Sequence, residues 1–171
     1  FKRDDVEFRA FKETVNAGGV VRCIRAPKVS DKPRSFFDKL NDWARGEGAP
    51  GLGYIVFEAE GGKGPIAKFL PAAALNELKQ LTGAEAGDAV FFVCDKEAPA
   101  AKLAGYARTR IATELDLIDR NEYRFCWIVD FPMYEYNEEL KKIDFVHNPF
   151  SMPQGGMKAL QEKDPLTILA Y

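Results

Sequence analysis

The chain has 171 residues and a formal net charge of −2, from 24 lysines and arginines against 26 aspartates and glutamates. Its 46% hydrophobic and 29% charged residues predict a folded globule of about one domain with an appendage, and exclude a disordered chain. The near-neutral charge also excludes a nucleic-acid binder that works through a strongly basic surface.

Apolar runs, the first residues and the cysteines narrow the class of protein further. No run approaches the roughly 18 apolar residues that a membrane span needs. The chain starts at Phe1 without an initiator methionine or a signal peptide, which favours a piece of a longer protein. Cys23, Cys94 and Cys126 are far apart and lie in apolar runs, so we expect reduced, buried thiols in a cytoplasmic protein.

Strand signals recur along the first 95 residues. They are short runs rich in β-branched and aromatic residues, bounded by glycine or proline. A glycine-rich turn at residues 61–64 joins two of them as a hairpin. The predicted strands cover residues 20–24, 54–57, 66–70 and 89–94.

Apolar residues at helical spacing predict three helices between these strands. The first is expected to be capped by Ser35 and to end at Gly46. The second has Pro71 in its first turn and Gly83 as its C-cap. The third and longest begins at Pro99 and carries its apolar stripe as far as residue 118.

This order of elements predicts a two-layer α+β domain over residues 1–120, with a largely antiparallel sheet and amphipathic helices. A doubly wound sheet would need more strand–helix crossovers than the sequence shows. The expected core consists of Val21, Ile24, Phe37 or Phe36, Leu40, Trp43, Ile55, Phe57, Leu75, Leu78, Val90, Phe92, Leu103, Ile111 and Leu115.

Residues 121–171 differ in character from this domain. An apolar strand at residues 125–132 is stopped by Pro132, and an acidic segment with a net charge of −3 follows over residues 130–144. A proline-punctuated loop and a short helical tail complete the chain. Because this part has too little apolar periodicity for a core of its own, we expect it to be part of a second domain.

His147 is the sole histidine, and this excludes most self-contained active sites. No cysteine lies at metal-ligand spacing from another, so a zinc site is disfavoured. There is no G-x-S-x-G motif, no P-loop and no G-x-G-x-x-G that opens a helix after a strand. We therefore expect no catalytic residue and no metal site within this chain.

Two weak signals for nucleic-acid binding have simpler explanations. Residues 50–57 resemble the RNP1 strand of an RNA-recognition motif, but Pro50 replaces its cation and Leu52 replaces a stacking aromatic residue. A glycine turn that leads into a core strand explains the same residues. The loop with Arg25, Lys28, Lys32 and Arg34 has cations that could contact phosphates, although solvated loops commonly carry such charges.

Residues 125–153 are similar to bacterial-type aspartyl-tRNA synthetases (aspartate–tRNA ligases). The sequence W-I-V-D-F-P at residues 127–132 and H-N-P-F-S-M-P at residues 147–153 resemble two motifs of that family, with an acidic hairpin between them. The first part resembles the GAD insertion domain of the same enzymes. The stretches that carry this second resemblance are residues 39–57, 64–70 and 87–92.

The resemblance implies a role for the loop around His147. In the family, the first residue of H-[HN]-P-F lies against bound aspartate, so His147 would bind aspartate in the parent protein, with Asn148, Pro149 and Phe150 as candidate neighbours. Many family members have a second histidine at the position of Asn148, which leaves any role for that residue open.

The resemblance also implies an activity. Class II synthetases of this kind activate aspartate with ATP and Mg²⁺ and transfer it to tRNA, and the parent would be a cytoplasmic homodimer. Residues 121–171 would then be a partial catalytic segment beside the insertion domain. We expect the isolated chain to be an inactive monomer, because the ATP-binding motifs and the aspartate-clamping arginine lie outside it.

A second class of function remains open from the sequence. The chain could be a free-standing α+β binding module that contacts RNA or an amidotransferase, since the B subunit of the tRNA-dependent amidotransferase carries a GAD domain too. Flanking synthetase motifs in the reading frame would distinguish the two. The sequence leaves open whether the parent charges tRNA(Asp) alone or also tRNA(Asn).

Overall fold

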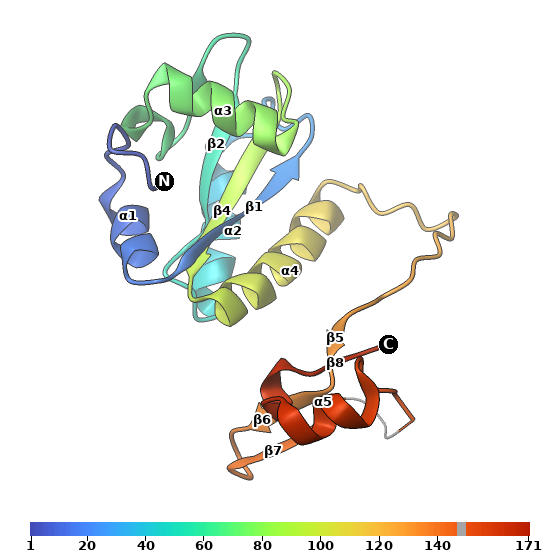
Figure 1. Cartoon of the computed structure of the whole chain (residues 1–171). Helices are drawn as coiled ribbons and strands as arrows, with labels where there is room; N and C mark the ends of the chain where they lie inside the picture. The colour runs from blue at the N-terminus through green and yellow to red at the C-terminus, as the bar shows by residue number, and fades with distance from the viewer. Residues whose placement is uncertain (147–149) are drawn as a thin grey trace. The chain divides into compact units, whose positions relative to one another are not determined.

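The computed structural model describes residues 1–146 and 150–171. The chain divides into two compact units, Phe1–Asp119 and Arg120–Tyr171. Figure 1 shows the course of the chain, coloured from blue at the N-terminus to red at the C-terminus. Within the described part, no helix is both long enough and apolar enough to cross a lipid bilayer.

The first unit alternates helices and strands. Its helices are α1 (Arg9–Asn16), α2 (Arg34–Gly46), α3 (Ala72–Thr82) and α4 (Glu97–Glu114), with a short 3-10 helix η1 (Ala67–Phe69). Its strands are β1 (Val20–Ala26), β2 (Gly53–Phe57), β3 (Gly62–Lys63) and β4 (Ala89–Asp95).

The four strands form one antiparallel sheet in the order β1-β4-β2-β3. Strand β4 therefore lies inside the sheet, paired with β1 on one edge and with β2 on the other. Its residues from Ala89 to Val93 are all buried. The largely antiparallel α+β arrangement predicted from the sequence is confirmed.

The number of layers differs from the prediction, because helices cover both faces of the sheet. On one face, Phe91 of β4 packs in a cluster with residues of α2 and α4. On the other face, Phe92 packs with residues of α3 and with aromatic residues at and before α1. The unbroken apolar run of β4 was a sign of burial on both faces, since a strand with one wet face alternates.

The predicted core is confirmed, although some of its residues are fully buried and others only partly. Every residue of that prediction belongs to one of the two clusters, either buried or packed against it. Leu78 is half-buried, and Leu81, which follows on the same helix, is 78% exposed. The apolar face of α3 is therefore shorter than its sequence pattern.

The ends of the helices follow local chemistry. Helix α2 starts one residue before Ser35, after Pro33, and no side chain caps it, so the predicted serine cap is wrong. Gly83 ends α3 in the left-handed conformation with a φ of 62°, as its position after the last apolar residue predicted. Helix α4 ends at Glu114, four residues before the end of the predicted stripe at residue 118.

One strand prediction fails in the first unit, and one helix was missed. The predicted strand at residues 66–70 contains η1 instead, and the second arm of the hairpin with β2 is the two-residue strand β3. Helix α1 was not predicted. Its aromatic residue Phe11 lies against Phe1, Phe8 and Phe92, with ring centroids 4.7–6.1 Å apart. These contacts are with residues distant in sequence or before the helix, so helical periodicity gives little sign of them.

The second unit is small and mainly of short strands. Its elements are β5 (Phe131–Pro132), β6 (Tyr134–Asn137), β7 (Lys142–Phe145), α5 (Gly156–Glu162), η2 (Pro165–Thr167) and β8 (Leu169–Ala170). The acidic segment forms the antiparallel hairpin β6–β7. Met133, Ile168 and Ala170 are the buried residues of its small apolar cluster.

The strand predicted at residues 125–132 is wrong for this chain except at its end. Only Phe131 and Pro132 pair, with β8, and residues 123–129 have no regular structure. Phe125 and Trp127 are 97% and 94% exposed. A strand forms by pairing, and no described segment pairs with this run.

The prediction of three buried cysteines is also wrong. Cys23 and Cys126 are exposed, and Cys94 is half-buried. Cys23 lies on the edge strand β1, where one side of the strand meets water. Partial burial still raises the pKa of the Cys23 and Cys94 thiols above their ordinary value, which makes both less reactive.

Candidate functional site

The loop expected to bind aspartate is described only at its borders. His147, Asn148 and Pro149 lie outside the described residues. Phe150 is 89% exposed, so its ring is not a buried support in this structure. The proposed roles of these residues therefore stay predictions.

Both borders of that loop are held by backbone hydrogen bonds. On the near side, Val146 N–H donates to Met133 O at 3.1 Å. On the far side, Tyr171 N–H donates to Met152 O at 3.1 Å and Gln154 N–H donates to Leu169 O at 2.8 Å. The small cluster around Met133 thus anchors the chain where it enters and leaves the loop.

A side-chain contact links the first resemblance motif to the residue that directly follows the second. Gln154 Nε2 donates to Asp130 Oδ1 at 2.5 Å and to Ala170 O at 3.3 Å. Asp130 belongs to W-I-V-D-F-P and has a positive φ of 57°, which is uncommon for a residue other than glycine. The contact fixes this turn beside the segment that follows the loop.

The acidic hairpin β6–β7 neutralises much of its charge locally. Lys141 pairs with Glu138 at 3.0 Å, and Lys142 pairs with Asp144 at 3.1 Å. The hydrogen bond from Lys142, with help from the Phe145 N–H, lowers the pKa of Asp144 below its ordinary value. Among the described residues, no group of three histidine, cysteine, aspartate or glutamate side chains could hold a metal ion.

Asp88 organises the loops at one end of the sheet, and sequence reasoning missed it. Its side chain is buried and accepts hydrogen bonds from Arg25 Nε at 2.7 Å, Lys28 N at 3.0 Å and Glu85 N at 2.9 Å. A single carboxylate directly before a fully apolar strand was the signal. Arg25, one cation of the predicted phosphate-contacting loop, is therefore engaged within the protein.

The RNP1-like stretch does not form an open stacking platform. The ring of Tyr54 on β2 is stacked on Phe37 of α2, with centroids 4.2 Å apart and planes 18° apart. An RNA-recognition motif needs its aromatic rings on an open sheet face. Here helices cover both faces, so the RNA-recognition interpretation is wrong.

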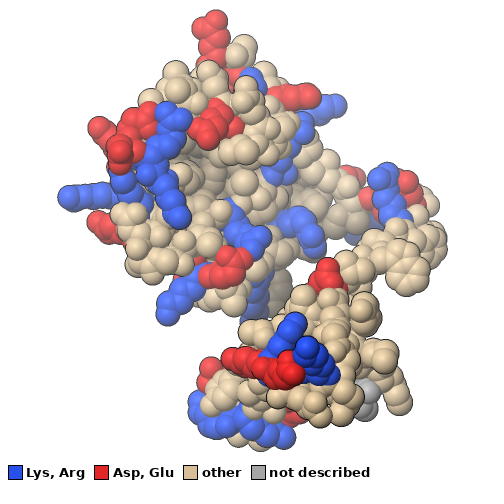
Figure 2. Space-filling model, in the orientation of Figure 1, with Lys and Arg blue, Asp and Glu red and all other residues tan. Residues whose placement is uncertain are grey.

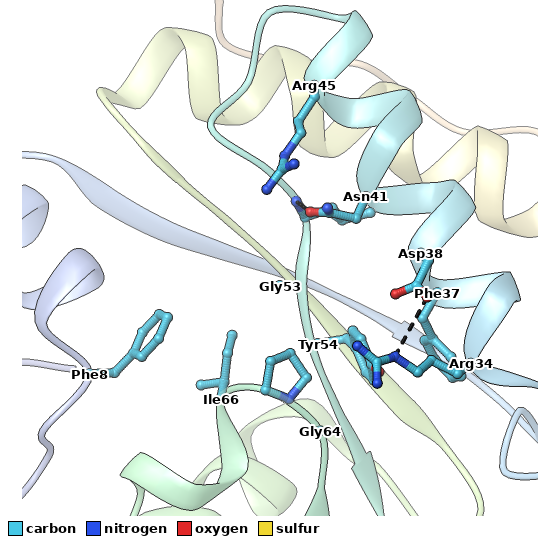
Figure 3. A pocket seen from close by; sticks show the side chains of 12 residues that line it. Phe8, Arg34, Phe37, Asp38, Asn41, Arg45, Gly53, Tyr54, Gly64 and Ile66 are labelled. Carbon is cyan, nitrogen blue, oxygen red and sulfur yellow. Dashed lines mark hydrogen bonds and ion pairs between the residues drawn. The ribbon is translucent and has the colours of Figure 1, made fainter.

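A pocket of about 550 Å³ opens beside α2 and β2, a volume typical of small-molecule sites. Figure 3 shows Arg45 and Asn41 at one end, Arg34 and Asp38 further along α2, and Phe8 and Ile66 across from the helix. Burial raises the pKa of Tyr54 in this pocket, the charge of Asp38 adds to that rise, and Arg34 opposes it. Tyr54 is therefore a neutral hydroxyl near pH 7.

Outside this pocket, the face in Figure 2 has lysine and arginine side chains interspersed with aspartate and glutamate. Several surface charges of the first unit are paired, as in Arg22–Glu97 and Arg110–Glu114. Mixed charges of this kind give little long-range attraction for a polyanion.

Comparisons with known proteins identify the relatives of the chain. Residues 11–104 match the GAD domain family. The chain is 61% identical to the aspartate–tRNA(Asp/Asn) ligase of Beijerinckia indica, over 100% of this chain and 29% of that protein. Corresponding ligases of Gluconobacter oxydans and Methylorubrum extorquens are 58% and 61% identical, over 98% and 99% of this chain.

These alignments extend through both units of the chain. Because they take in nearly all of it, they include the segment with W-I-V-D-F-P and H-N-P-F-S-M-P as well as the GAD match. The chain spans less than a third of the length of these relatives, at 28–29%.

Proposed function

This chain belongs to the GAD-domain family, and from that premise we propose that it is the insertion domain and adjoining catalytic segment of an aspartate–tRNA ligase. The parent protein would activate aspartate with ATP and transfer it to tRNA. The observation that carries this proposal is the identity of about 60% to such ligases across both units. A free-standing GAD module would require only the first unit, whereas the identity to these ligases continues through the second.

The exposed apolar segment at residues 125–129 supports a longer parent. Phe125, Trp127, Ile128 and Val129 are between 66% and 97% exposed, and large apolar patches of this kind mark surfaces that other protein covers. The relatives have more than twice as much further chain. We propose that this segment becomes a β-strand of the parent's catalytic domain when its pairing partners are present.

Substrates, partners and location follow from the same proposal. The parent would bind aspartate, ATP and tRNA, act as a homodimer and work in the cytoplasm. The names of the relatives include both tRNA(Asp) and tRNA(Asn), and we propose the same breadth here. We propose that ATP and Mg²⁺ bind to the rest of the parent.

The proposal predicts activity in the parent and none in this chain. We expect full-length protein to catalyse aspartate-dependent exchange of pyrophosphate into ATP and to charge tRNA(Asp) and tRNA(Asn) transcripts. The purified 171-residue chain should do neither, because near-attack geometry needs clamping groups that it lacks. A full-length protein that prefers another amino acid would refute the proposal, and exchange by the chain alone would refute the division of the site.

A second prediction concerns His147 in the full-length parent. A histidine nitrogen can donate to the side-chain carboxylate of aspartate, and a hydrogen bond to a charged group contributes about 1.5–3 kcal/mol. We expect His147→Ala to lower kcat/KM for aspartate by about 10- to 150-fold, measured by pyrophosphate exchange. The KM for ATP and the melting temperature should stay nearly unchanged.

The neighbouring substitution Asn148→Ala provides the matched control for His147→Ala. It alters the same loop and removes a polar side chain, so general loosening of the loop would lower the activity of both variants equally. If His147→Ala lost stability while its aspartate kinetics stayed normal, the residue would be structural.

A further inference from the structure

The pocket beside α2 and β2 has a polar end formed by Asn41 and Arg45. Asn41 Oδ1 accepts a hydrogen bond from Leu52 N–H at 3.0 Å, and this bond fixes which way the amide is turned. Its NH₂ group therefore points away from Leu52 with two donors that no described residue uses. Asn41 lines the pocket, so an amide of fixed orientation is available to a ligand there.

Arg45 lies beside this amide, four residues later on the same helix. A Cβ atom added to Gly51 would be 2.7 Å from Asn41 Oδ1 and 3.9 Å from Arg45 Nε, so the two side chains flank the same glycine. Arg45 makes no hydrogen bond or ion pair with the described residues. Its guanidinium and the Asn41 amide lie at the same end of the pocket (Figure 3).

The charges along the pocket single out this end for an anion. Arg34 faces Asp38 at 3.6 Å, so that pair is close to neutral. Among the described lining residues, Arg45 is then the cation without a counter-charge. A guanidinium beside an amide NH₂ group suits an oxyanion such as phosphate, which accepts several hydrogen bonds at once.

The rest of the pocket suits a flat, largely apolar group. Half-buried Phe8 and exposed Pro65 line the pocket away from α2, and Ile66 beside them is buried in the core. Tyr54 adds a hydroxyl to the lining. Aromatic rings and flat apolar walls stack on nucleobases with little regard to sequence. A volume of about 550 Å³ has room for one nucleoside.

We propose that this pocket binds one phosphorylated nucleoside, with its phosphate at Asn41 and Arg45 and its base against Phe8 and Pro65. The unit comes either as a free nucleotide or as one residue of an RNA strand. All lining residues except Phe8 lie in the part of the chain that matches the GAD domain, and this proposal does not depend on the proposed ligase activity.

An acidic peptide is a less suitable occupant. A peptide would gain most from adding a strand to the edge of β2. That edge is already closed at Tyr54, because the Gly64 backbone lies so near that a Cβ there would be 2.8 Å from Tyr54 O. A carboxylate side chain alone would leave the apolar side of the pocket, at Phe8 and Pro65, without a contact.

Nuclear magnetic resonance titration of the ¹⁵N-labelled chain tests the proposal. The probes are AMP, UMP, a single-stranded hexaribonucleotide and an acidic hexapeptide. We expect AMP or the hexaribonucleotide to shift the amides of Asn41, Arg45, Leu52 and Ile66. Response to AMP identifies a free nucleotide as a ligand, and response to the hexaribonucleotide alone identifies RNA. Response only to the peptide, or to none of the probes, would overturn the proposal.

The variant Asn41→Asp tests the role of the Asn41 donors most directly. An aspartate keeps the oxygen that accepts from Leu52 N–H, so the turn should stay folded, but it replaces two donors by a second acceptor with negative charge. We expect binding at least about tenfold weaker, the loss for a hydrogen bond to a charged group.

Two controls separate the pocket from general charge effects. Asn76→Asp introduces the same charge at an exposed position of α3, and Arg108→Ala matches Arg45→Ala at an exposed position of α4. Both controls should bind within about twofold of the unchanged chain, whereas Arg45→Ala should bind about tenfold more weakly. Equal losses in the pocket variants and the controls would show non-specific attraction and refute the site.

Discussion

Phe91→Ala should reduce the free energy of unfolding of the first unit by about 3–5 kcal/mol, the largest effect that we expect from one core substitution. Phe91 is fully buried at the centre of β4, where its ring lies 5.9 Å from that of Phe37 and 6.2 Å from that of Tyr54. Truncation leaves a cavity between the sheet and α2 that these two stacked rings cannot fill without separating. Both the lost burial and the cavity therefore contribute.

Urea unfolding followed by tryptophan fluorescence measures this loss. A Trp127→Phe background leaves Trp43 as the reporter, and Trp43 packs against the cluster that contains Phe91. Phe125→Ala is the matched control, since the same truncation at a side chain 97% exposed should change stability by less than about 0.5 kcal/mol. If Phe91→Ala cost under about 1 kcal/mol, the first unit would not be held together by this cluster.

Asp88→Ala should destabilise the first unit by about 2–4 kcal/mol. The substitution removes the acceptor of three donors, two of which are backbone N–H groups of Lys28 and Glu85 in the loops around it. Leaving such donors unsatisfied is costly, and hydrogen bonds to a charged acceptor are among the stronger ones. Arg25 can turn to water, since its side chain is 37% exposed, and this keeps the loss below that of a fully buried pair.

Asp88 also makes stability depend on pH. Burial alone would raise the pKa of this carboxyl group, but the hydrogen bonds from Glu85 N, Lys28 N and Arg25 outweigh it and lower the pKa below its ordinary 3.8. Because the folded pKa is the lower one, the stabilisation is present above pH 3.8 and is lost as the pH falls through the folded pKa. Stability should therefore decline on acidification in the unchanged chain.

Asp88→Asn mimics the protonated carboxyl group and isolates this effect. The difference in unfolding free energy between the unchanged chain and Asp88→Asn should be largest near pH 7 and should shrink as the pH falls below about 4. Asp38→Asn is the control, since that carboxylate is 59% exposed in a surface ion pair and its loss should cost less than about 1 kcal/mol. A difference for Asp88→Asn that stayed constant with pH would show that its charge does not stabilise the fold.

Local sequence signals predicted most of the first unit. The apolar run before Cys94 predicted the central strand, and Gly83 predicted the end of α3, because both depend on residues within one turn or one strand. The motifs at residues 127–132 and 147–153 predicted the family, and this prediction is confirmed by relatives about 60% identical. Residues 147–149 lie outside the described structure, so the role of His147 stays a prediction.

The sequence by itself thus determined strands β1, β2 and β4, helices α2, α3 and α4, the core residues and the family of this protein. The tertiary structure alone decided that helices cover both faces of the sheet and that Asp88 holds two loops. It also decided that Asn41 and Arg45 lie together at one end of the pocket beside α2 and β2. The physical reason is that each depends on contacts between segments far apart in the chain. The spacing of apolar residues along a helix or strand shows which of its sides faces an apolar layer. It does not show which other segment supplies that layer.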